Sequence, residues 1–328
     1  MKKLKLFLIL IVLLVSKIDQ ATGQNEVYLK IQSEGYQPIN LFIASFESGH
    51  QAELFEQVRQ VILNDLLFSG YFRLTDMTTN DVVSSGNEPI QTMPGSMEAL
   101  VEAKFETVKN VIQARVRLSE LSTKKLIFHK KFEEQIQRTR FLAHKISDEL
   151  VYHLIGVRGI ATTQIVFVTQ NSNIKELAVF DYDGFGFRKL TSLNSLNLSP
   201  RWSPDGKMIA FTSYVNANPD LLLLNLKDGK LFNVSNQKGL NTSPSWSPDG
   251  KKIALTMTID GNPEIYTLEL NNKRWNRLTN NLAIDSSPSW SPDGREIVFT
   301  SDRSGTPQLY LMNAEGGNVR RLTFQGNY

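Results

Sequence analysis

Pro200-Arg201-Trp202-Ser203-Pro204-Asp205-Gly206 returns almost unchanged at residues 244–250 and again at residues 288–294. The tryptophans of successive copies are 44 residues apart. Each Ser-Pro-Asp-Gly is typical of a tight turn, because proline has its φ already set, aspartate can bond the backbone ahead of it, and glycine relieves strain at the exit. So rich a motif at so regular a spacing indicates an internal structural repeat.

The remainder of each repeat has the pattern of β-structure. After the Trp-bearing strand and its turn, the sequence predicts a second strand at Lys207–Ser213, a third at Leu221–Leu226, a polar turn at Lys227–Lys230 and a fourth strand at Leu231–Val234. The apolar residues do not recur at the spacing of three and four that a helical repeat would show. Four short strands in 44 residues are the signature of a propeller blade.

The repeat is uneven at its start. The second to fourth strands occur four times, whereas the Trp-bearing strand occurs three times, and Arg158 stands where the first copy would place its tryptophan. We therefore predict four blades in residues 156–328, the first without its inner strand. An open set of blades would expose unpaired edges, which natural sheets avoid. We expect the propeller to be cut short at the C-terminus of this sequence.

Residues 24–155 contain no repeat and predict an α/β domain in front of the all-β propeller. Apolar spacing favours two helices, Gln51–Leu67 and Arg138–Leu154, the second ended by Gly156. The other expected elements are a buried strand at Asn40–Phe46, a returning strand at Tyr71–Leu74, a hairpin around Ser122-Thr123 and a loop at Ser84–Gly95.

The first 23 residues have the pattern of a signal peptide. Lysines near the start precede the apolar run Leu6–Val15, which is short for a membrane span, and Ala21-Thr22-Gly23 supplies the small residues before a cleavage site at Gln24. An uncleaved membrane anchor is the alternative. No second long apolar segment follows, so we expect an exported, soluble mature protein.

Composition and motifs argue against several classes of function. The net charge of +3 is spread along the chain, which gives no concentrated basic face for nucleic acid. The absence of cysteine excludes disulfides, thiolate metal sites and cysteine nucleophiles. The sequence also lacks a nucleophile elbow, a phosphate loop and a dinucleotide fingerprint. We therefore expect no catalytic residue, no cofactor and no metal.

The residues with potential chemistry have plainer structural explanations. His144 and His153 are nine residues apart on one helix, which is the wrong spacing for a metal site, so all four histidines are expected to be structural or on the surface. The recurring aspartates and tryptophans occupy the same place in each blade. This recurrence favours turn formation over acid catalysis for Asp205, Asp249 and Asp293, and packing between blades over a stacking platform for Trp202, Trp246 and Trp290.

The segments that enter each Trp-bearing strand are the candidate binding surface. Asn197-Leu198-Ser199, Asn241-Thr242-Ser243 and Asp285-Ser286-Ser287 occupy equivalent positions, which we expect at one rim of the central channel. A ring of such side chains would suit a partner loop or a cation, and a solvated polar loop is the alternative. Turns holding Asp183 and Asp228 are expected at the outer part of the blades. The predicted partner-binding residues are Asn197, Ser199, Asn241, Thr242, Ser243, Asp285 and Ser286.

The Trp-Ser-Pro-Asp-Gly repeats, the serine-rich approach to each tryptophan, Phe180-Asp181-Tyr182-Asp183-Gly184 and the Arg-Leu-Thr endings together resemble the TolB family of periplasmic propellers. The resemblance covers the whole chain. It implies a monomeric, six-bladed propeller that binds the peptidoglycan-associated lipoprotein Pal through its channel-side surface. It also implies contact between TolA and the N-terminal segment from Gln24, and a role in outer-membrane integrity and cell division.

The tryptophan motif alone also occurs in the propellers of prolyl-oligopeptidase-like peptidases. Their hydrolase domain, with its serine, aspartate and histidine, is absent from this sequence. The first hypothesis is thus a periplasmic adaptor of the Tol–Pal type, and the alternative is the propeller portion of such a peptidase without its catalytic domain.

Overall fold

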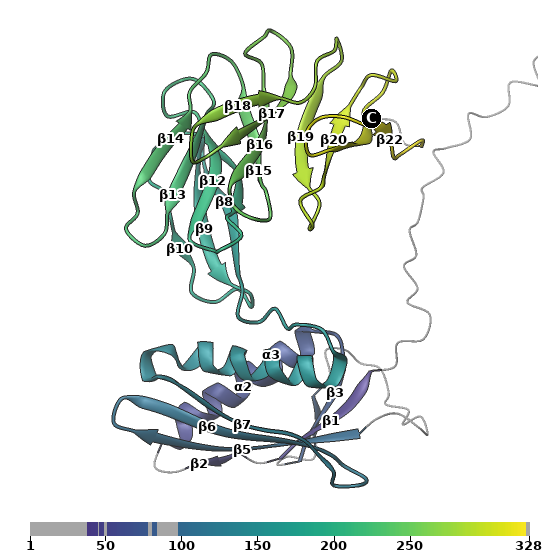
Figure 1. Cartoon of the computed structure of the whole chain (residues 1–328). Coiled ribbons are helices and arrows are strands. Elements are labelled where there is room, and N and C mark those ends of the chain that lie inside the picture. The colour runs from purple at the N-terminus through teal and green to yellow at the C-terminus, as the bar shows by residue number, and fades with distance from the viewer. Residues whose placement is uncertain (1–37, 45, 49–50, 78–80, 84–97, 326–328) are drawn as a thin grey trace, which may run out of the picture. The chain divides into compact units, whose positions relative to one another are not determined.

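The computed structural model describes residues 38–44, 46–48, 51–77, 81–83 and 98–325 (Figure 1). The predicted signal peptide, the segment from Gln24 and the predicted loop Ser84–Gly95 lie outside these residues. Within the described part of the chain, no helix is both long enough and apolar enough to cross a membrane.

The α/β domain is built on a seven-stranded sheet with the order β4-β3-β1-β5-β6-β7, in which β2 also pairs with β5. β1 runs parallel to both β3 and β5, whereas the β5–β6 and β6–β7 pairs are antiparallel. The strands are β1 (Ile39–Ile43), β2 (Glu47–Ser48), β3 (Phe72–Asp76), β4 (Asp81–Val83), β5 (Glu98–Val108), β6 (Val111–Glu120) and β7 (Leu126–Gln135).

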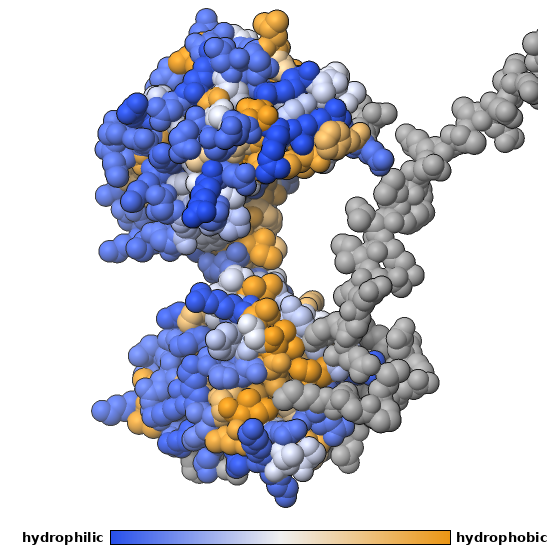
Figure 2. All heavy atoms as spheres, turned by 45° about the vertical axis from the view of Figure 1, so that its right-hand side comes forward, coloured by the Kyte–Doolittle hydropathy of each residue, from blue (hydrophilic) through white to orange (hydrophobic). Residues whose placement is uncertain are grey.

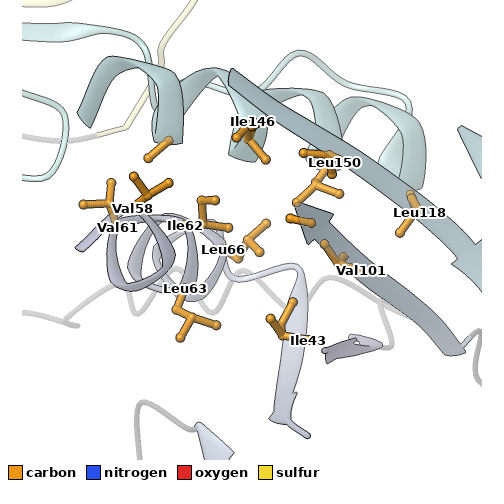
Figure 3. Close-up of a cluster of buried hydrophobic side chains, with 14 of the residues drawn as sticks. Ile43, Val58, Val61, Ile62, Leu63, Leu66, Val101, Leu118, Ile146 and Leu150 are labelled. Atoms are coloured by element: carbon orange, nitrogen blue, oxygen red, sulfur yellow. The ribbon is translucent and has the colours of Figure 1, made fainter. Parts of the chain in front are cut away.

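Two helices, α2 (Ala52–Phe68) and α3 (Thr139–Ile155), cover one face of this sheet (Figure 1). A 3₁₀ turn, Ile136–Arg138, leads into α3, and Gly156 ends it in the left-handed conformation that glycine adopts at low cost. Both helices turn apolar residues toward the strands, as Figure 3 shows. The labelled core residues are Ile43, Val58, Val61, Ile62, Leu63, Leu66, Val101, Leu118, Ile146 and Leu150, and all are buried.

The sequence predicted these helices to within one residue at each end, and the predicted hairpin is confirmed as β6 and β7. Two strands differ from the prediction. β1 ends at Ile43 instead of Phe46, and the strand predicted at Tyr71–Leu74 is β3, displaced to Phe72–Asp76. β5, which lies between β1 and β6 in the sheet, was not predicted.

The propeller part consists of four antiparallel sheets, the first with three strands and the others with four. The prediction that the first blade lacks an inner strand is therefore confirmed for the described residues. The strands are β8 (Gln164–Asn171), β9 (Ile174–Asp181) and β10 (Arg188–Lys189); β11 (Asn197–Trp202), β12 (Met208–Ser213), β13 (Asp220–Asn225) and β14 (Leu231–Ser235); β15 (Asn241–Trp246), β16 (Lys252–Met257), β17 (Glu264–Glu269) and β18 (Arg274–Arg277); and β19 (Asp285–Trp290), β20 (Glu296–Ser301), β21 (Gln308–Asn313) and β22 (Arg320–Arg321).

Each Trp-bearing strand contains a proline in its interior, which a regular ladder would not accept because proline has no N–H to donate. A register shift surrounds that proline in all three strands. The serine before it, Ser199, Ser243 or Ser287, has a positive φ of 52–56°. The repeated Ser-Pro is thus a β-bulge, which leaves the proline out of the ladder and bends the strand.

The tryptophans lie between successive blades, as predicted. Trp246 packs with Ala210 and Leu223 of the preceding blade and with Ile253 of its own. Trp202 and Trp290 belong to equivalent apolar clusters, each shared by two adjacent blades. On the face shown in Figure 2, most of the propeller surface is hydrophilic, whereas hydrophobic residues gather on the α/β domain. The apolar residues of each blade are therefore explained by burial between adjacent sheets.

Candidate functional site

The predicted rim segments are the beginnings of the inner strands β11, β15 and β19. β15 contacts both β11 and β19, and β11 also contacts β8 of the first blade. The leading residues Asn197, Asn241 and Asp285 are fully buried at 0% exposure, which corrects the expectation that these segments are connecting loops. Ser199, Thr242, Ser243 and Ser286 are half-buried. Partner binding at these seven residues stays a prediction, and the four half-buried hydroxyl residues are the ones that a partner could reach.

The buried leading residues join neighbouring blades through hydrogen bonds. Asn197 Nδ2 donates to Glu176 Oε2 at 3.1 Å and to the carbonyl oxygen of Lys175 at 2.8 Å. The hydroxyl of Thr191 donates to the same Glu176 carboxylate and accepts from the N–H of Leu177. Because Glu176 and Thr191 belong to the first blade and Asn197 to the second, the group fastens one blade to the next.

The same arrangement returns in later blades with conservative changes. Thr279 donates to Glu264, and Asn281 links that carboxylate to Asp285, whose Oδ2 also accepts from Arg303 at 2.7 Å. In the blade between them, Ser235 donates to Asn241. Thr191, Ser235 and Thr279 follow one another at intervals of 44 residues, near the ends of successive blades. This network explains why each is a hydroxyl residue, because a buried carboxylate or amide needs hydrogen-bond partners.

The repeated aspartates form turns, as predicted. Asp205 Oδ1 accepts from the hydroxyl of Ser203 at 2.7 Å and from the N–H of Lys207 at 3.1 Å. Asp249 and Asp293 accept the equivalent two hydrogen bonds. The hydroxyl bond, followed by the backbone bond, lowers the pKa of all three carboxyls below the usual value. They hold the turns as anions and face no common site.

The histidines differ in their surroundings. His129 is exposed, His153 stacks on Phe128 with ring centroids 4.5 Å apart, and His50 lies outside the described residues. His144 is buried, and its Nδ1 lies 2.7 Å from Asp65 Oδ2. Its Nε2 lies 4.0 Å from Asp183 Oδ2. Sequence reasoning missed this group because its members come from α2, α3 and the turn after β9.

Asp183 lies in the turn between β9 and β10, which was expected at the outer part of its blade, and this turn contacts the α/β domain. The α/β domain and the propeller blades belong to one compact unit, Ile39–Tyr328. Within it, Asp183 forms an ion pair with Arg140 of α3, and its side chain is only 8% exposed. The Arg140 guanidinium also lies over the ring of Phe185, 3.9 Å from its centroid. The first blade therefore docks on α3 through charged and aromatic side chains.

A small pocket of about 160 Å³ adjoins these contacts. Its lining includes Asp65 and Phe68 of α2, Asp148 of α3, Arg158 of the connection and Tyr182 of the first blade. Burial, and then the nearby carboxylates of Asp65, Asp148 and Asp183, raise the pKa of Tyr182. These surroundings are consequently acidic.

Comparison with known proteins agrees with both parts of this architecture. A family model described as the TolB beta propeller domain matches residues 151–328, which is more than half of the chain. A second, described as the TolB amino-terminal domain, matches residues 27–127. The chain belongs to the TolB family.

Similar members of the TolB family come from several bacteria. The protein TolB homolog of Chlorobium chlorochromatii is 31% identical over 219 residues, which cover 64% of this chain and 49% of that protein. The Tol-Pal system protein TolB of Roseobacter denitrificans is 32% identical over 211 residues, covering 62% and 48%. The chain thus spans about half the length of the curated relatives that it matches.

A solved TolB structure has the same fold. The crystal structure of TolB from Acinetobacter baumannii superposes with a TM-score of 0.75 at 29% sequence identity, covering 89% of this chain and 73% of that one. The prediction of an α/β domain followed by propeller blades is therefore confirmed, and so is the resemblance to TolB.

Proposed function

We propose that this chain is a protein-binding adaptor of the Tol–Pal envelope system, exported to the periplasm and without catalytic activity of its own. It binds the lipoprotein Pal through the channel-side surface of the propeller and TolA through the N-terminal segment from Gln24. Through these contacts it supports outer-membrane integrity and cell division. Family membership in both domains supports the proposal, as do relatives named Tol-Pal system protein TolB.

The observation that carries the Pal-binding part of the proposal is that hydroxyl residues occupy equivalent positions in the inner strands of successive blades. Ser199 and Ser243 occupy equivalent bulges of β11 and β15, and Thr242 and Ser286 occupy the adjacent equivalent position of β15 and β19. These hydroxyls are half-buried on strands that contact one another. They offer hydrogen-bond donors and acceptors to a partner, while the buried residues beneath them keep the strands in place.

Calorimetry with the soluble domain of Pal from the same organism tests this part. Thr242→Arg with Ser286→Arg places two bulky cations among the half-buried hydroxyls without removing a buried hydrogen bond. We expect affinity for Pal to fall at least about tenfold, a loss of about 1.4 kcal/mol. Asp228→Arg, in the exposed turn between β13 and β14, is the control and should bind like the wild type.

A second, less bulky double variant separates loss of binding from loss of folding. Ser199→Asn with Ser243→Asn adds less bulk, and asparagine accepts the positive φ of these positions better than most residues do. It should weaken Pal binding while the melting temperature stays near that of the wild type. Wild-type affinity in both variants would place the Pal interface elsewhere, with the N-terminal domain as the next region to test.

A further inference from the structure

A group of four charged or titratable side chains, three of them buried, lies where the first blade docks on the α/β domain. Asp65 comes from α2, Arg140 and His144 from α3, and Asp183 from the turn after β9. The side chains of Asp65, His144 and Asp183 are 1%, 3% and 8% exposed. Water therefore contributes little to balancing their charges, and the group must balance them internally.

The hydrogen bonds in this group are incomplete on one side. His144 Nδ1 lies 2.7 Å from Asp65 Oδ2, within hydrogen-bonding distance. His144 Nε2 is buried without a hydrogen-bond partner, and the atom facing it at 4.0 Å is Asp183 Oδ2. Asp65 Oδ1 is also buried and unpartnered. Asp183 is held from its other side by Arg140 and by the N–H of Phe185.

The charges of the group sum to zero only when His144 carries a second proton. Asp65 and Asp183 supply two negative charges, and the Arg140 guanidinium supplies one permanent positive charge. A neutral His144 that donates through Nδ1 to Asp65 points the lone pair of Nε2 at the Asp183 carboxylate, which is repulsive. A doubly protonated ring instead presents an N–H to each carboxylate.

The remaining neighbours, Asp148, Tyr182 and Arg158, add no net charge to the group. Asp148, one turn further along α3, accepts from the N–H groups of Ala161 and Thr162 in the connection to the blades. Tyr182, from the turn that holds Asp183, has its pKa raised by burial and then by the carboxylates of Asp65, Asp148 and Asp183. Arg158, in the connection between α3 and the blades, lines the adjoining pocket together with Asp65 and is a second cation in addition to Arg140.

We propose that His144 is a proton-dependent latch between the α/β domain and the first propeller blade. Protonation of Nε2 gives the ring a hydrogen to donate to Asp183 and closes the contact. Loss of that proton leaves Arg140 as the one partner of Asp183 in this group that comes from the α/β domain, and it loosens the docking. The docked state therefore gains stability as pH falls and loses it as pH rises, with one proton taken up on docking.

A metal ion is the competing occupant of this group. Ligand atoms of Asp65, His144 and Asp183 lie within 4.8 Å of one another, which a divalent cation could span. However, Asp65 already holds Nδ1, and Arg140 contacts the same Asp183 oxygen that a metal on Nε2 would need. A metal would thus keep two protein ligands beside a fixed cation, fewer than zinc sites use. The proton fits the site better.

Fluorescence energy transfer in the full-length protein tests the latch. The sequence contains no cysteine, so Ser122→Cys on the α/β domain and Lys227→Cys on the propeller give two unique dye sites, both exposed. Transfer efficiency is measured from pH 5.5 to 8.5 with a metal chelator present. We expect the ratio of docked to undocked molecules to fall as pH rises, by at most about tenfold per pH unit for one proton.

Two histidine variants in the same dye-labelled background separate the latch from other titrations. His144→Gln removes the titrating ring and should abolish the pH dependence of transfer. His153→Gln removes a second histidine of α3, which bonds Glu149 and does not contact Asp183, and should keep the wild-type pH profile. A wild-type profile in His144→Gln, or a flat profile in the wild type, would refute the proposal.

Zinc distinguishes the metal alternative. With the chelator omitted and Zn²⁺ added at pH 8, the latch predicts no recovery of docking. Recovery of docking by Zn²⁺ in the wild type, lost in His144→Gln, would overturn the proton latch and establish a metal site instead.

Discussion

The indole Nε1 of Trp246 donates a hydrogen bond to the backbone carbonyl oxygen of Arg201, 3.2 Å away, and so connects β15 to the inner strand of the preceding blade. Trp290 occupies the equivalent place one blade later, but its Nε1 is buried without a partner. Identical motifs therefore make unequal contributions to the contact between blades.

This inequality predicts different costs for the same substitution. Trp246→Phe should lower the free energy of unfolding by about 1 kcal/mol because it removes one hydrogen bond. Trp290→Phe should cost less, because it removes no hydrogen bond and eliminates a buried N–H that has no partner. Trp246→Ala leaves a void between two blades and should cost about 3–5 kcal/mol. Urea denaturation followed by circular dichroism measures all three. Equal losses for the two Trp→Phe variants would contradict the assignment.

The hydroxyl that closes each blade should matter most where it is buried. Thr279 donates to the buried Glu264 carboxylate and accepts from the N–H of Ile265, so Thr279→Val should lower the free energy of unfolding by about 1–3 kcal/mol for each buried group left unpaired. Thr323→Val is the matched control, because its bond to the N–H of Leu309 is exposed and its bond to Gln308 is only part-buried, whereas both bonds of Thr279 are buried. A denaturation midpoint that moves equally in both variants would show that burial does not set the cost.

The repeat could be predicted from sequence because its determinants are local. A turn that needs proline, aspartate and glycine in order shows itself within seven residues, and the tryptophans keep its phase. The central strand β5 was missed although Ala99, Val101, Ala103 and Phe105 alternate inward. Its alanines, glutamates and lysine favour helices, and pairing with β1 and β6 overrides that preference.

The candidate site was predicted less well because burial of polar residues depends on tertiary partners. Asn197, Asn241 and Asp285 were expected to face solvent, as such residues usually do. Partners from adjacent strands and blades bond Asn197 Nδ2, Asn241 and Asp285 Oδ2. Asn197 Oδ1 and Asp285 Oδ1 are nevertheless buried without a partner. Asp183 became part of a domain contact through a tertiary partner as well, since Arg140 is 43 positions away in sequence. The 44-residue repeat thus predicted where these residues lie in the blade, but it could not predict which side chains they contact.

Asp285→Ala should therefore reduce stability, and not only partner binding. Its Oδ2 accepts from Asn281 Nδ2 and from Arg303 Nη2, each at 2.7 Å, and alanine leaves both donors without that acceptor. We expect a loss of about 1–3 kcal/mol in the free energy of unfolding. Asp285→Asn should lose less, because asparagine keeps an acceptor oxygen and already fills the equivalent positions 197 and 241. Thermal melts compare the two variants, and an unchanged melt for Asp285→Ala would contradict the observed burial.

The turn aspartates predict a loss of stability in acid. Hydrogen bonds from serine hydroxyls, and then from backbone N–H groups, lower the pKa of Asp205, Asp249 and Asp293 in the folded protein. A lowered folded-state pKa stabilises the protein above the unfolded value of 3.8 and ceases to do so as pH falls through the folded-state value. The triple Asp→Asn variant should show a smaller fall in its urea midpoint between pH 5 and pH 2.5. An identical fall in wild type and variant would assign acid unfolding to other carboxyls.

Gly159, in the connection between α3 and β8, should tolerate no side chain. A Cβ there would come within 2.5 Å of the Asp148 Cα, and a backbone atom of a helix cannot move aside cheaply. Gly159→Ala should thus push the connection off α3 and loosen the bonds from Ala161 and Thr162 to the Asp148 carboxylate. Amide hydrogen exchange at Ala161 and Thr162 should become faster, with the amides of β16 unaffected. Gly317→Ala is the matched control, because a Cβ there meets only the flexible side chain of Asn313 at 3.1 Å. Unchanged exchange at Ala161 in Gly159→Ala would mean that the connection does not lie against α3 in solution.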